Sequence, residues 1–218
     1  MLGALEAWNH RPIDPAAIAE EGRRIEVEEL GIAGGRQDHY AATHGGALGL
    51  TFSADVTVTR IAMPASTRRD LLASCTLIYT GESRISSDTI TAVLGAYEAG
   101  QPVVHEALRR MRELALDMSR ALASGDLHAL GELVGEHWEY QRSLHHSIPT
   151  ARIDDIVARA HRAGALGAKA MGASGGGCVL VMSRPSTTET VRHALRGLGE
   201  VIDFEIDDAG LVVTEATS

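Results

Sequence analysis

The order of the secondary-structure patterns along the chain predicts an α+β fold. Strand patterns at residues 47–52, 55–62 and 73–79 come first, and residues 87–163 then carry helical patterns. After a glycine-rich segment, the apolar run from Cys178 to Met182 is typical of a buried strand. Because strands and helices are grouped rather than regularly alternating, the pattern favours α+β over a parallel βαβ sheet.

Length, charge and cysteine content indicate a soluble globular protein. A chain of 218 residues can bury a sizeable core without disulfides or metals. Its net charge of −9 fits poorly with wrapping nucleic acid or binding anionic membranes. Its 2 cysteines, Cys75 and Cys178, form neither a disulfide framework nor a zinc motif. With no apolar run of about 18 residues, we expect a cytoplasmic protein that binds neither nucleic acid nor membrane.

The sequence predicts two helices first, and it marks the start of the second more clearly than the start of the first. Leu2, Leu5 and Trp8 share one helical face, although this helix begins at Met1 without an N-cap. Asp14 followed by Pro15 predicts an N-cap with proline at the first helical position, and the helix continues over residues 16–30. Alternating residues around the turn at residues 53–55 then predict two paired strands.

The later elements are separated by proline, glycine and serine. We expect helices over residues 87–98, 102–123, 126–146 and 150–163. Beyond the apolar run we expect one further helix and two short strands, at residues 187–197, 201–206 and 211–213 respectively.

A glycine-rich segment precedes the apolar run. Six of the 14 residues from Gly164 to Gly177 are glycine, which lets backbone N–H groups approach an anion closely. The predicted order of helix, glycine loop and strand excludes a Walker A loop and a dinucleotide fingerprint, which both run from strand to helix. Two interpretations of this segment remain open: a tight helix-to-strand connection and an anion site. Lys169 is expected to be a surface or rim charge.

A second candidate segment follows the helix that ends near residue 30. Asp38 stands in the glycine-flanked sequence Gly34-Gly35-Arg36-Gln37-Asp38, where it is either a catalytic base or an ordinary turn cap. Glu26 lies 12 residues earlier, on the predicted helix. Two carboxylates so placed suit a metal ligand and a base, but spacing alone leaves both alternatives open. The histidines at positions 105, 137, 145 and 146 form no convincing metal motif.

Several motifs in order resemble the GHMP small-molecule kinases. The motifs are Glu26, then residues 34–46, then Tyr79-Thr80-Gly81-Glu82-Ser83-Arg84, then Gly172–Gly177, and finally residues 201–212. The sequence is most similar to the branch that acts on D-glycero-D-manno-heptose 7-phosphate, and the resemblance covers nearly the whole chain. His39 and Ser174 depart from that branch, which has Gln and Gly at these places.

The resemblance implies ATP-dependent phosphoryl transfer to a sugar or sugar-phosphate hydroxyl. It assigns Asp38 as the catalytic residue and Glu26 as the Mg²⁺ ligand. It places the segment Gly172, Ala173, Ser174, Gly175, Gly176 and Gly177 beside the nucleotide. Substrate contacts are expected from Gly34, Gly35, Gln37, Ser83 and Arg84. The guanidinium of Arg84 suits a substrate phosphate, although a rim salt bridge is an equal alternative.

One part of the family pattern is missing from this sequence. It contains no Pro-x-x-x-Gly-Leu-Gly-Ser-Ser loop, which in the family cradles the ATP phosphates. We therefore expect residues 1–65 to be a remnant of the N-terminal kinase domain and residues 66–218 to be the C-terminal domain. Three alternatives remain: a truncated sugar kinase, a split or non-catalytic subunit, and a plain α+β domain. A homo-oligomer or a complementing chain would be the protein partner.

Overall fold

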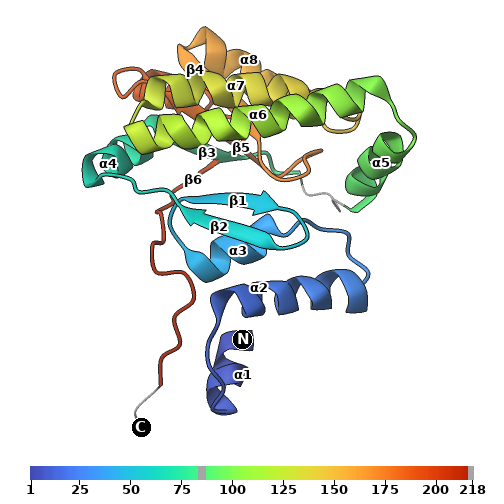
Figure 1. Ribbon diagram of the computed structural model, residues 1–218. Coiled ribbons are helices and arrows are strands. Elements are labelled where there is room, and N and C mark those ends of the chain that lie inside the picture. Colours follow the sequence, from blue (N-terminus) through green and yellow to red (C-terminus); the bar gives the residue numbers. More distant parts are fainter. Residues whose placement is uncertain (83–86, 216–218) are drawn as a thin grey trace. The chain divides into compact units, whose positions relative to one another are not determined.

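The computed structural model describes residues 1–82 and 87–215, and it confirms the α+β fold. The chain forms two compact units (Figure 1): Met1–Ala62 with Glu205–Ser218, and Met63–Phe204. The first boundary lies close to the expected one at residue 65. Residues 205–215, however, group with the first unit and not with the second. The assignment of the two expected ranges as kinase domains stays a prediction.

The first unit begins with four short helical segments. These are α1 (Leu2–Trp8), α2 (Pro15–Arg24), the π-helical segment η1 (Ile25–Glu29) and α3 (Gln37–His44). The predicted N-cap is confirmed, because the Asp14 carboxylate accepts a hydrogen bond from the Ala16 N–H at 3.0 Å. Helix α3 was not predicted, so Asp38 lies in the first turn of a helix and not in a glycine-flanked turn.

The same unit contains the predicted pair of strands. Strands β1 (Leu48–Phe52) and β2 (Val56–Arg60) form an antiparallel hairpin in which Leu50 faces Val58. Among the described residues this sheet has two strands, so each strand has one edge without a backbone partner. Such an edge is a surface on which another strand can pair.

The C-terminal segment completes the first unit. The N–H of Gly46 donates to the Asp207 carbonyl at 2.6 Å, and the N–H of Leu211 donates to the Thr43 carbonyl at 3.1 Å. A Cβ on Gly210 would lie 2.6 Å from the Thr43 carbonyl oxygen, so glycine permits this close approach. The strand expected at residues 211–213 is wrong, since this segment joins no ladder.

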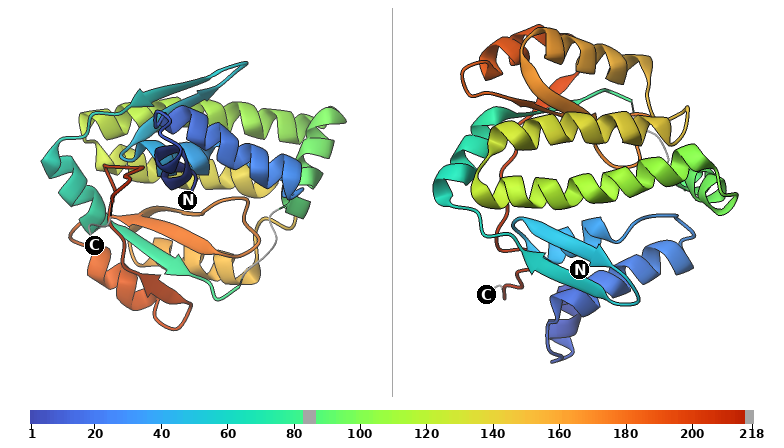
Figure 2. Two further views of the ribbon diagram at one scale, coloured as in Figure 1. Left: turned by 90° about the horizontal axis from the view of Figure 1, so that it is seen from below. Right: turned by 45° about the horizontal axis from the view of Figure 1, so that its top comes forward.

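The second unit is built on a four-stranded antiparallel sheet (Figure 2). Its order is β4 (Ala165–Ala170), β5 (Cys178–Ser183), β3 (Cys75–Tyr79) and β6 (Glu200–Ile202). In the register, Leu77 of β3 faces Leu180 on one side and Ile202 on the other. The strand expected over residues 201–206 is therefore present but shorter.

Helices make up the rest of the second unit. The four predicted between residues 87 and 163 are confirmed as α5 (Ser87–Glu98), α6 (Pro102–Ser124), α7 (Leu127–Ser143) and α8 (Ala151–Arg162). Their caps explain the boundaries. Asp126 accepts from the Ala129 N–H at 2.9 Å, and Thr150 accepts from the Ile153 N–H at 3.2 Å. Helix α9 (Thr188–Ala194) matches its prediction, whereas α4 (Ala65–Ser74) was missed.

Strand β4 corrects the prediction for the glycine-rich segment. Its first half is a strand paired with β5, and the true loop is the hairpin connection at residues 171–177. The order is therefore strand, glycine loop, strand. Gly167 of β4 packs directly on α7, where a Cβ would lie 2.0 Å from the Gly131 carbonyl oxygen and 2.6 Å from the Gly135 nitrogen. Small residues in β4 thus serve close contact with a helix.

Both faces of β5 are buried, as its uninterrupted apolar run predicts. Val179 and Val181 belong to the main hydrophobic cluster, together with residues of α8 and α9. Met182 belongs to a smaller cluster with Leu130 and Val134 of α7. Strand β5 is therefore the centre of the second unit, and the glycine loop leads directly into it.

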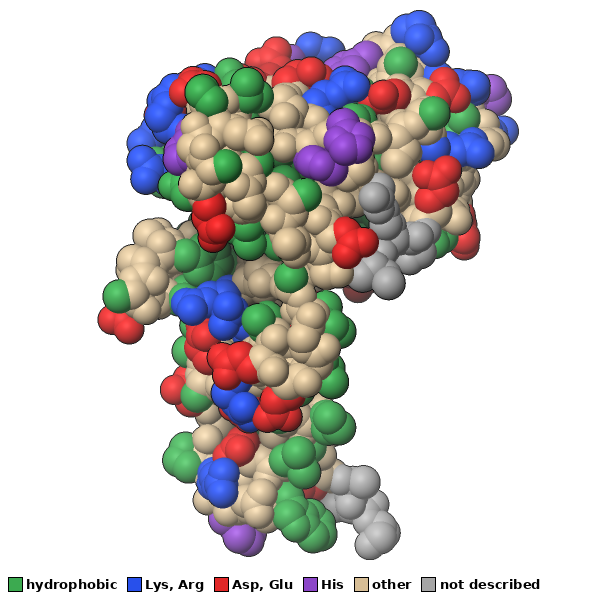
Figure 3. Space-filling model, turned by 90° about the vertical axis from the view of Figure 1, so that its right-hand side faces the viewer, with side chains coloured by type: hydrophobic (Ala, Val, Ile, Leu, Met, Phe, Trp, Pro, Cys, Tyr) green, Lys and Arg blue, Asp and Glu red, His purple; other side chains and the backbone are tan. Residues whose placement is uncertain are grey.

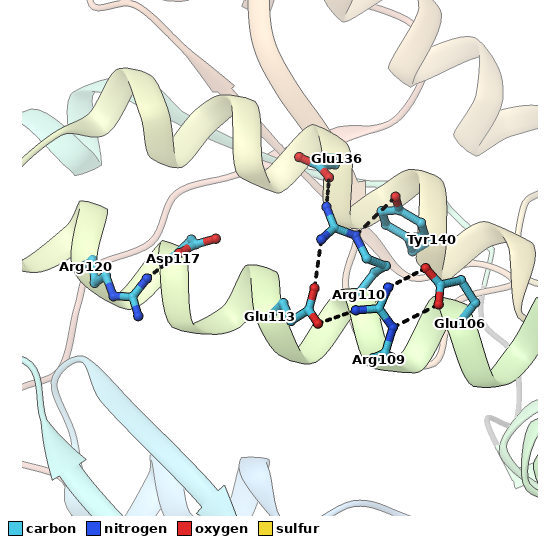
Figure 4. A network of polar contacts seen from close by, with 8 residues as sticks. All are labelled: Glu106, Arg109, Arg110, Glu113, Asp117, Arg120, Glu136 and Tyr140. Carbon is cyan, nitrogen blue, oxygen red and sulfur yellow. Dashed lines mark hydrogen bonds and ion pairs between the residues drawn. The ribbon is translucent and has the colours of Figure 1, made fainter.

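On the face drawn in Figure 3, blue and red side chains are interspersed rather than gathered by sign. One network joins α6 to α7 (Figure 4): Arg110 contacts Glu113 at 2.8 Å and Glu136 at 3.0 Å, and Arg109 contacts Glu106 and Glu113. These bonds lower the pKa of Glu113, with Arg110 as the main cause. The network is exposed, so it holds two neighbouring helices together only weakly.

Within the described part of the chain, no helix is both long and apolar enough to cross a membrane.

Candidate functional site

The predicted site residues divide between the two units. Glu26, Gly34, Gly35, Gln37 and Asp38 belong to the first unit. The glycine loop, with Gly172 to Gly177, belongs to the second. The residues of each group lie near one another within their own unit.

In the first unit, Glu26 lies against two other motif residues. Its Oε2 atom is 2.7 Å from Nε2 of His39, on α3. The approach lacks the alignment of a hydrogen bond, so it is a close polar contact between the two side chains. A Cβ on Gly34 would lie 3.5 Å from the Glu26 carboxylate. The fold therefore brings the predicted Mg²⁺ ligand next to the glycine pair and next to the helix that carries Asp38.

Asp38 is exposed, on the first turn of α3. Its side chain makes no hydrogen bond or ion pair with the described residues, so it does not act as a turn cap or as a cap of α3. Gln37 is also exposed and folds back over Gly35, where a Cβ would lie 2.1 Å from the Gln37 Oε1 atom. A free carboxylate on a helix start is available to a substrate hydroxyl.

Tyr40 fixes the orientation of α3 on α2. Its hydroxyl donates to Oε1 of Glu20 at 2.8 Å, and its ring is 3% exposed. Burial, with a further contribution from Glu20, raises the pKa of Tyr40 to about 12. Because the ring lies two positions beyond Asp38 and is buried, it anchors the turn that presents the carboxylate. This anchoring role was not predicted from the sequence.

In the second unit, the glycine loop is held at several points. The Gln141 side chain of α7 donates to the Gly172 carbonyl at 2.9 Å, and the Gly177 N–H donates to the Glu82 carbonyl at 2.7 Å. Gly176 has φ +149° and is so close to Glu82 that a Cβ would lie 2.8 Å from the Glu82 carbonyl oxygen. The loop is therefore a rigid connection that needs glycine.

Ser174 is the departure from the family pattern within this loop. It adopts φ 72°, a left-handed conformation that is uncommon for residues other than glycine. It is 6% exposed, and its hydroxyl donates to the Ile148 carbonyl at 2.8 Å. The same carbonyl accepts from the Gly175 N–H at 3.0 Å. The serine thus adds a bond to the loop but keeps the backbone shape that glycine would adopt.

The predicted substrate residues Ser83 and Arg84 lie outside the described residues. The residues just before them are well placed, however. Thr80 donates its hydroxyl and its N–H to the Gly177 carbonyl, both at 2.9 Å. Thr80 is therefore bonded directly to the end of the glycine loop.

Metal binding finds limited support in the side chains. The described residues contain no group of three or more His, Cys, Asp or Glu side chains that could hold a metal ion. Mg²⁺ is usually held by one or two carboxylates together with substrate phosphates, and not by a complete protein cage. A single carboxylate such as Glu26 fits that mode.

Lys169, expected to be a surface or rim charge, is less exposed than an ordinary surface lysine. It lies on β4, is half-buried, and is the lone lysine in the sequence. Burial lowers the pKa of Lys169 to about 8. The pKa of His137 on α7 falls to about 4, mainly through burial and further through the charge of Lys169. Two basic groups whose pKa values are lowered by burial therefore lie near each other between α7 and β4.

This arrangement predicts a stability change at alkaline pH. The pKa of Lys169 is about 8 in the folded chain, against roughly 10.4 in an unfolded chain. Between these values the unfolded chain binds more protons, so stability rises as the pH increases from about 8 to about 10.4. NMR of chain labelled with ¹³C-lysine gives one side-chain signal, which should titrate near pH 8. The urea-unfolded chain is the control, and a folded-state titration above pH 10 would contradict the prediction.

One family model and several known proteins are similar to this chain. Residues 118–201 match the family model described as GHMP kinases C terminal. The chain is 28% identical over 214 residues to the D-glycero-alpha-D-manno-heptose 7-phosphate kinase of Campylobacter jejuni, which covers 97% of this chain and 62% of the relative. It is 29% identical over 226 residues to the galactokinase of Mycobacterium tuberculosis, with coverages of 90% and 61%.

A solved structure agrees with these relatives. The D-glycero-D-manno-heptose 1-phosphate kinase of Bacteroides thetaiotaomicron superposes with a TM-score of 0.72 at 25% identity. The match covers 98% of this chain and 60% of that one. The chain thus spans about three fifths of the length of the relatives it matches.

The mixed helix and sheet architecture is consistent with the α+β fold of the GHMP kinases, and the relatives that this chain matches are phosphotransferases of that family. More particularly, the resemblance to the GHMP kinases is confirmed, because residues 118–201 match the C-terminal model of that family and the relatives above belong to it.

Proposed function

We propose that this chain is the larger part of an ATP-dependent sugar kinase that acts on a heptose phosphate or a similar sugar phosphate. The observation that supports the proposal most is the relationship to a heptose 7-phosphate kinase along 97% of the chain. That relationship includes both candidate groups, the Asp38 helix and the glycine loop.

In the proposed reaction, a sugar hydroxyl oxygen attacks the γ-phosphorus of ATP. A new O–P bond forms, the bond to the β-phosphate oxygen breaks, and ADP leaves. Asp38 accepts or orients the hydroxyl proton, a role that its exposed and unbonded carboxylate allows. Gly34, Gly35 and Gln37 contact the sugar in this proposal.

The remaining roles concern phosphate and charge. Glu26 would hold Mg²⁺, which when bound neutralises charge on the transferred phosphoryl group. The loop from Gly172 to Gly177 shapes the site beside the nucleotide, and Arg84 with Ser83 would bind the phosphate of the sugar. His39 would compete with the metal for Glu26, because it contacts the same carboxylate.

A second candidate is a non-catalytic or split-kinase subunit that lacks its own ATP loop. The sequence contains no Gly-Leu-Gly-Ser-Ser motif, which favours this alternative. Trp8 is 82% exposed on α1, and the β1–β2 hairpin has unpaired edges among the described strands, so further polypeptide could cover this unit. In this case another chain would supply the phosphate loop.

An ADP-release assay with ATP, Mg²⁺ and a sugar panel tests the proposal. The panel contains heptose 7-phosphate, heptose 1-phosphate, galactose and mevalonate. We expect weak ATP binding and slow turnover by the 218-residue chain, with heptose phosphates preferred. A turnover number of about 1–100 s⁻¹, which is usual for kinases, would contradict the expected slow turnover. A preference for galactose or mevalonate would overturn the heptose assignment.

The DNA upstream of the Met1 codon separates the two candidates. An uninterrupted reading frame that encodes a Gly-Leu-Gly-Ser-Ser loop would support a complete sugar kinase. A stop codon without such a loop would support the split or non-catalytic subunit.

A further inference from the structure

Gln141 of α7 is a buried side chain with only part of its hydrogen bonds made. It is 5% exposed, and its amide nitrogen donates to the Gly172 carbonyl at 2.9 Å. Its amide oxygen Oε1 is buried and has no hydrogen-bond partner among the described residues. A buried acceptor without a partner lowers stability, and an apolar side chain of the same size avoids this cost. Stability alone therefore does not account for glutamine at this position.

The loop that Gln141 contacts holds a second unfavourable feature. Ser174 has φ 72°, in the left-handed region that residues other than glycine seldom adopt. The Ser174 hydroxyl and the Gly175 N–H both donate to the Ile148 carbonyl, which holds this conformation in place. Two features that cost stability thus lie in and against one loop. Such costs persist most often where a precise backbone geometry serves function.

The bond from Gln141 sets the direction of one peptide group in the loop. In a planar trans peptide, the C=O group and the N–H of the next residue point in opposite directions. Because the Gly172 carbonyl points at Gln141, the Ala173 N–H points away from that side chain. The N–H groups of Gly172, Ala173 and Ser174 have no hydrogen-bond partner among the described residues. Consecutive N–H groups held in this way can donate to an anion.

We propose that Gln141 is a positioning residue, which holds the peptide between Gly172 and Ala173 so that the Ala173 N–H donates to a phosphate oxygen of ATP. This inference rests on the proposed function, in which the glycine loop lies beside the nucleotide. Gln141 itself does not touch ATP. Without its donor the peptide is free to rotate, because glycine adopts many backbone conformations and a Cβ at Gly172 would meet nothing within 4 Å.

Gln141→Met is the test variant, because methionine keeps an unbranched side chain but has neither the donor nor the unpaired oxygen. Val134→Ala is the control. Val134 lies on the same helix, is also 5% exposed, and packs in the smaller hydrophobic cluster. The thermal midpoint and the dissociation constant of ATP with Mg²⁺, from titration calorimetry, are measured on the full chain.

The two variants should separate stability from ATP binding. We expect Q141M to unfold at the midpoint of the wild type or above it, yet to bind ATP more weakly by a factor of about 5 or more, as for one lost hydrogen bond. V134A should unfold at a lower midpoint, because it loses buried methyl groups, and should keep the ATP affinity of the wild type. A purely structural role of Gln141 would give the reverse of the Q141M result.

NMR tests the peptide orientation without nucleotide. The ¹³C shift of the Gly172 carbonyl and the ¹⁵N shift of the Ala173 amide should change in Q141M and stay unchanged in V134A. Equal ATP affinity of Q141M and wild type would overturn the proposal. So would unchanged Gly172 and Ala173 shifts in Q141M, or a loss of ATP affinity in V134A as large as in Q141M.

The proposed function fails in a different way. If the wild type bound no ATP, the nucleotide role of the loop would be wrong, and the phosphate contact of Ala173 with it. The NMR shifts would still decide whether Gln141 orients the peptide, so the two failures give different results.

Discussion

Replacement of Asp38 by Asn is expected to reduce phosphoryl transfer by a factor of about 10²–10⁴, the usual contribution of a positioned acid or base. Asparagine keeps the size of the side chain but cannot accept the hydroxyl proton. ATP binding should stay nearly unchanged, because the proposed role of Asp38 concerns the sugar hydroxyl. The measurement is the turnover number in a preparation that transfers phosphate, together with the ATP dissociation constant.

The control for this variant is Asp55→Asn in the turn between β1 and β2, which removes the same charge from the same unit. It should retain the activity of the wild type. Both variants should fold, since Asp38 is exposed and makes no contact with the described residues. If D38N retained more than a tenth of the activity, Asp38 would not be the base.

Replacement of Gly167 by Ala is expected to destabilise the second unit by about 3 kcal/mol, near the upper end for overpacked cores. The added Cβ would lie 2.0 Å from the carbonyl oxygen of Gly131 and 2.6 Å from the nitrogen of Gly135. Both atoms belong to the backbone of α7, so no side chain can rotate to make room. Strand β4 and helix α7 would have to separate.

Urea denaturation measures this effect. Trp138 is 1% exposed and reports on the core of the second unit, whereas Trp8 is 82% exposed and should change little. Gly95→Ala is the matched control, because a Cβ at Gly95 in α5 meets nothing within 4 Å. That variant should be neutral or more stable by roughly 0.5–1 kcal/mol. A G167A variant within 1 kcal/mol of the wild type would show that the contact between α7 and β4 is loose.

The helices of the second unit could be predicted because several signals coincide in them. Proline at position 102, the αL glycine at position 125 and the capping residues Asp126 and Thr150 all mark their ends. Strand β4 could not be found in the same way. Four of its six residues are alanine or glycine, which have little strand propensity, and Gly167 allows close contact with α7. Tertiary packing overrides the local signal at this point.

The sequence motifs predicted which residues belong to the candidate site, but not which of their side chains contact one another. The motifs located Glu26 and Asp38, yet nothing in their spacing indicated that Glu26 would meet His39. Likewise, the glycine loop was recognised, but its bonds to Gln141 and Glu82 join residues far apart in the sequence. Such contacts depend on the three-dimensional arrangement of α7 and β3, which local patterns do not report.

The return of residues 207–211 to the first unit has a consequence for protein synthesis. The first unit takes residues from both sides of the second along the chain, so the ribosome makes this segment after the whole of Met63–Phe204. Until then, the carbonyl of Thr43 and the N–H of Gly46, at the end of α3, lack the partners they have in the folded chain. These contacts at the end of the helix that carries Asp38 are therefore made last, when a folded second unit can already have formed.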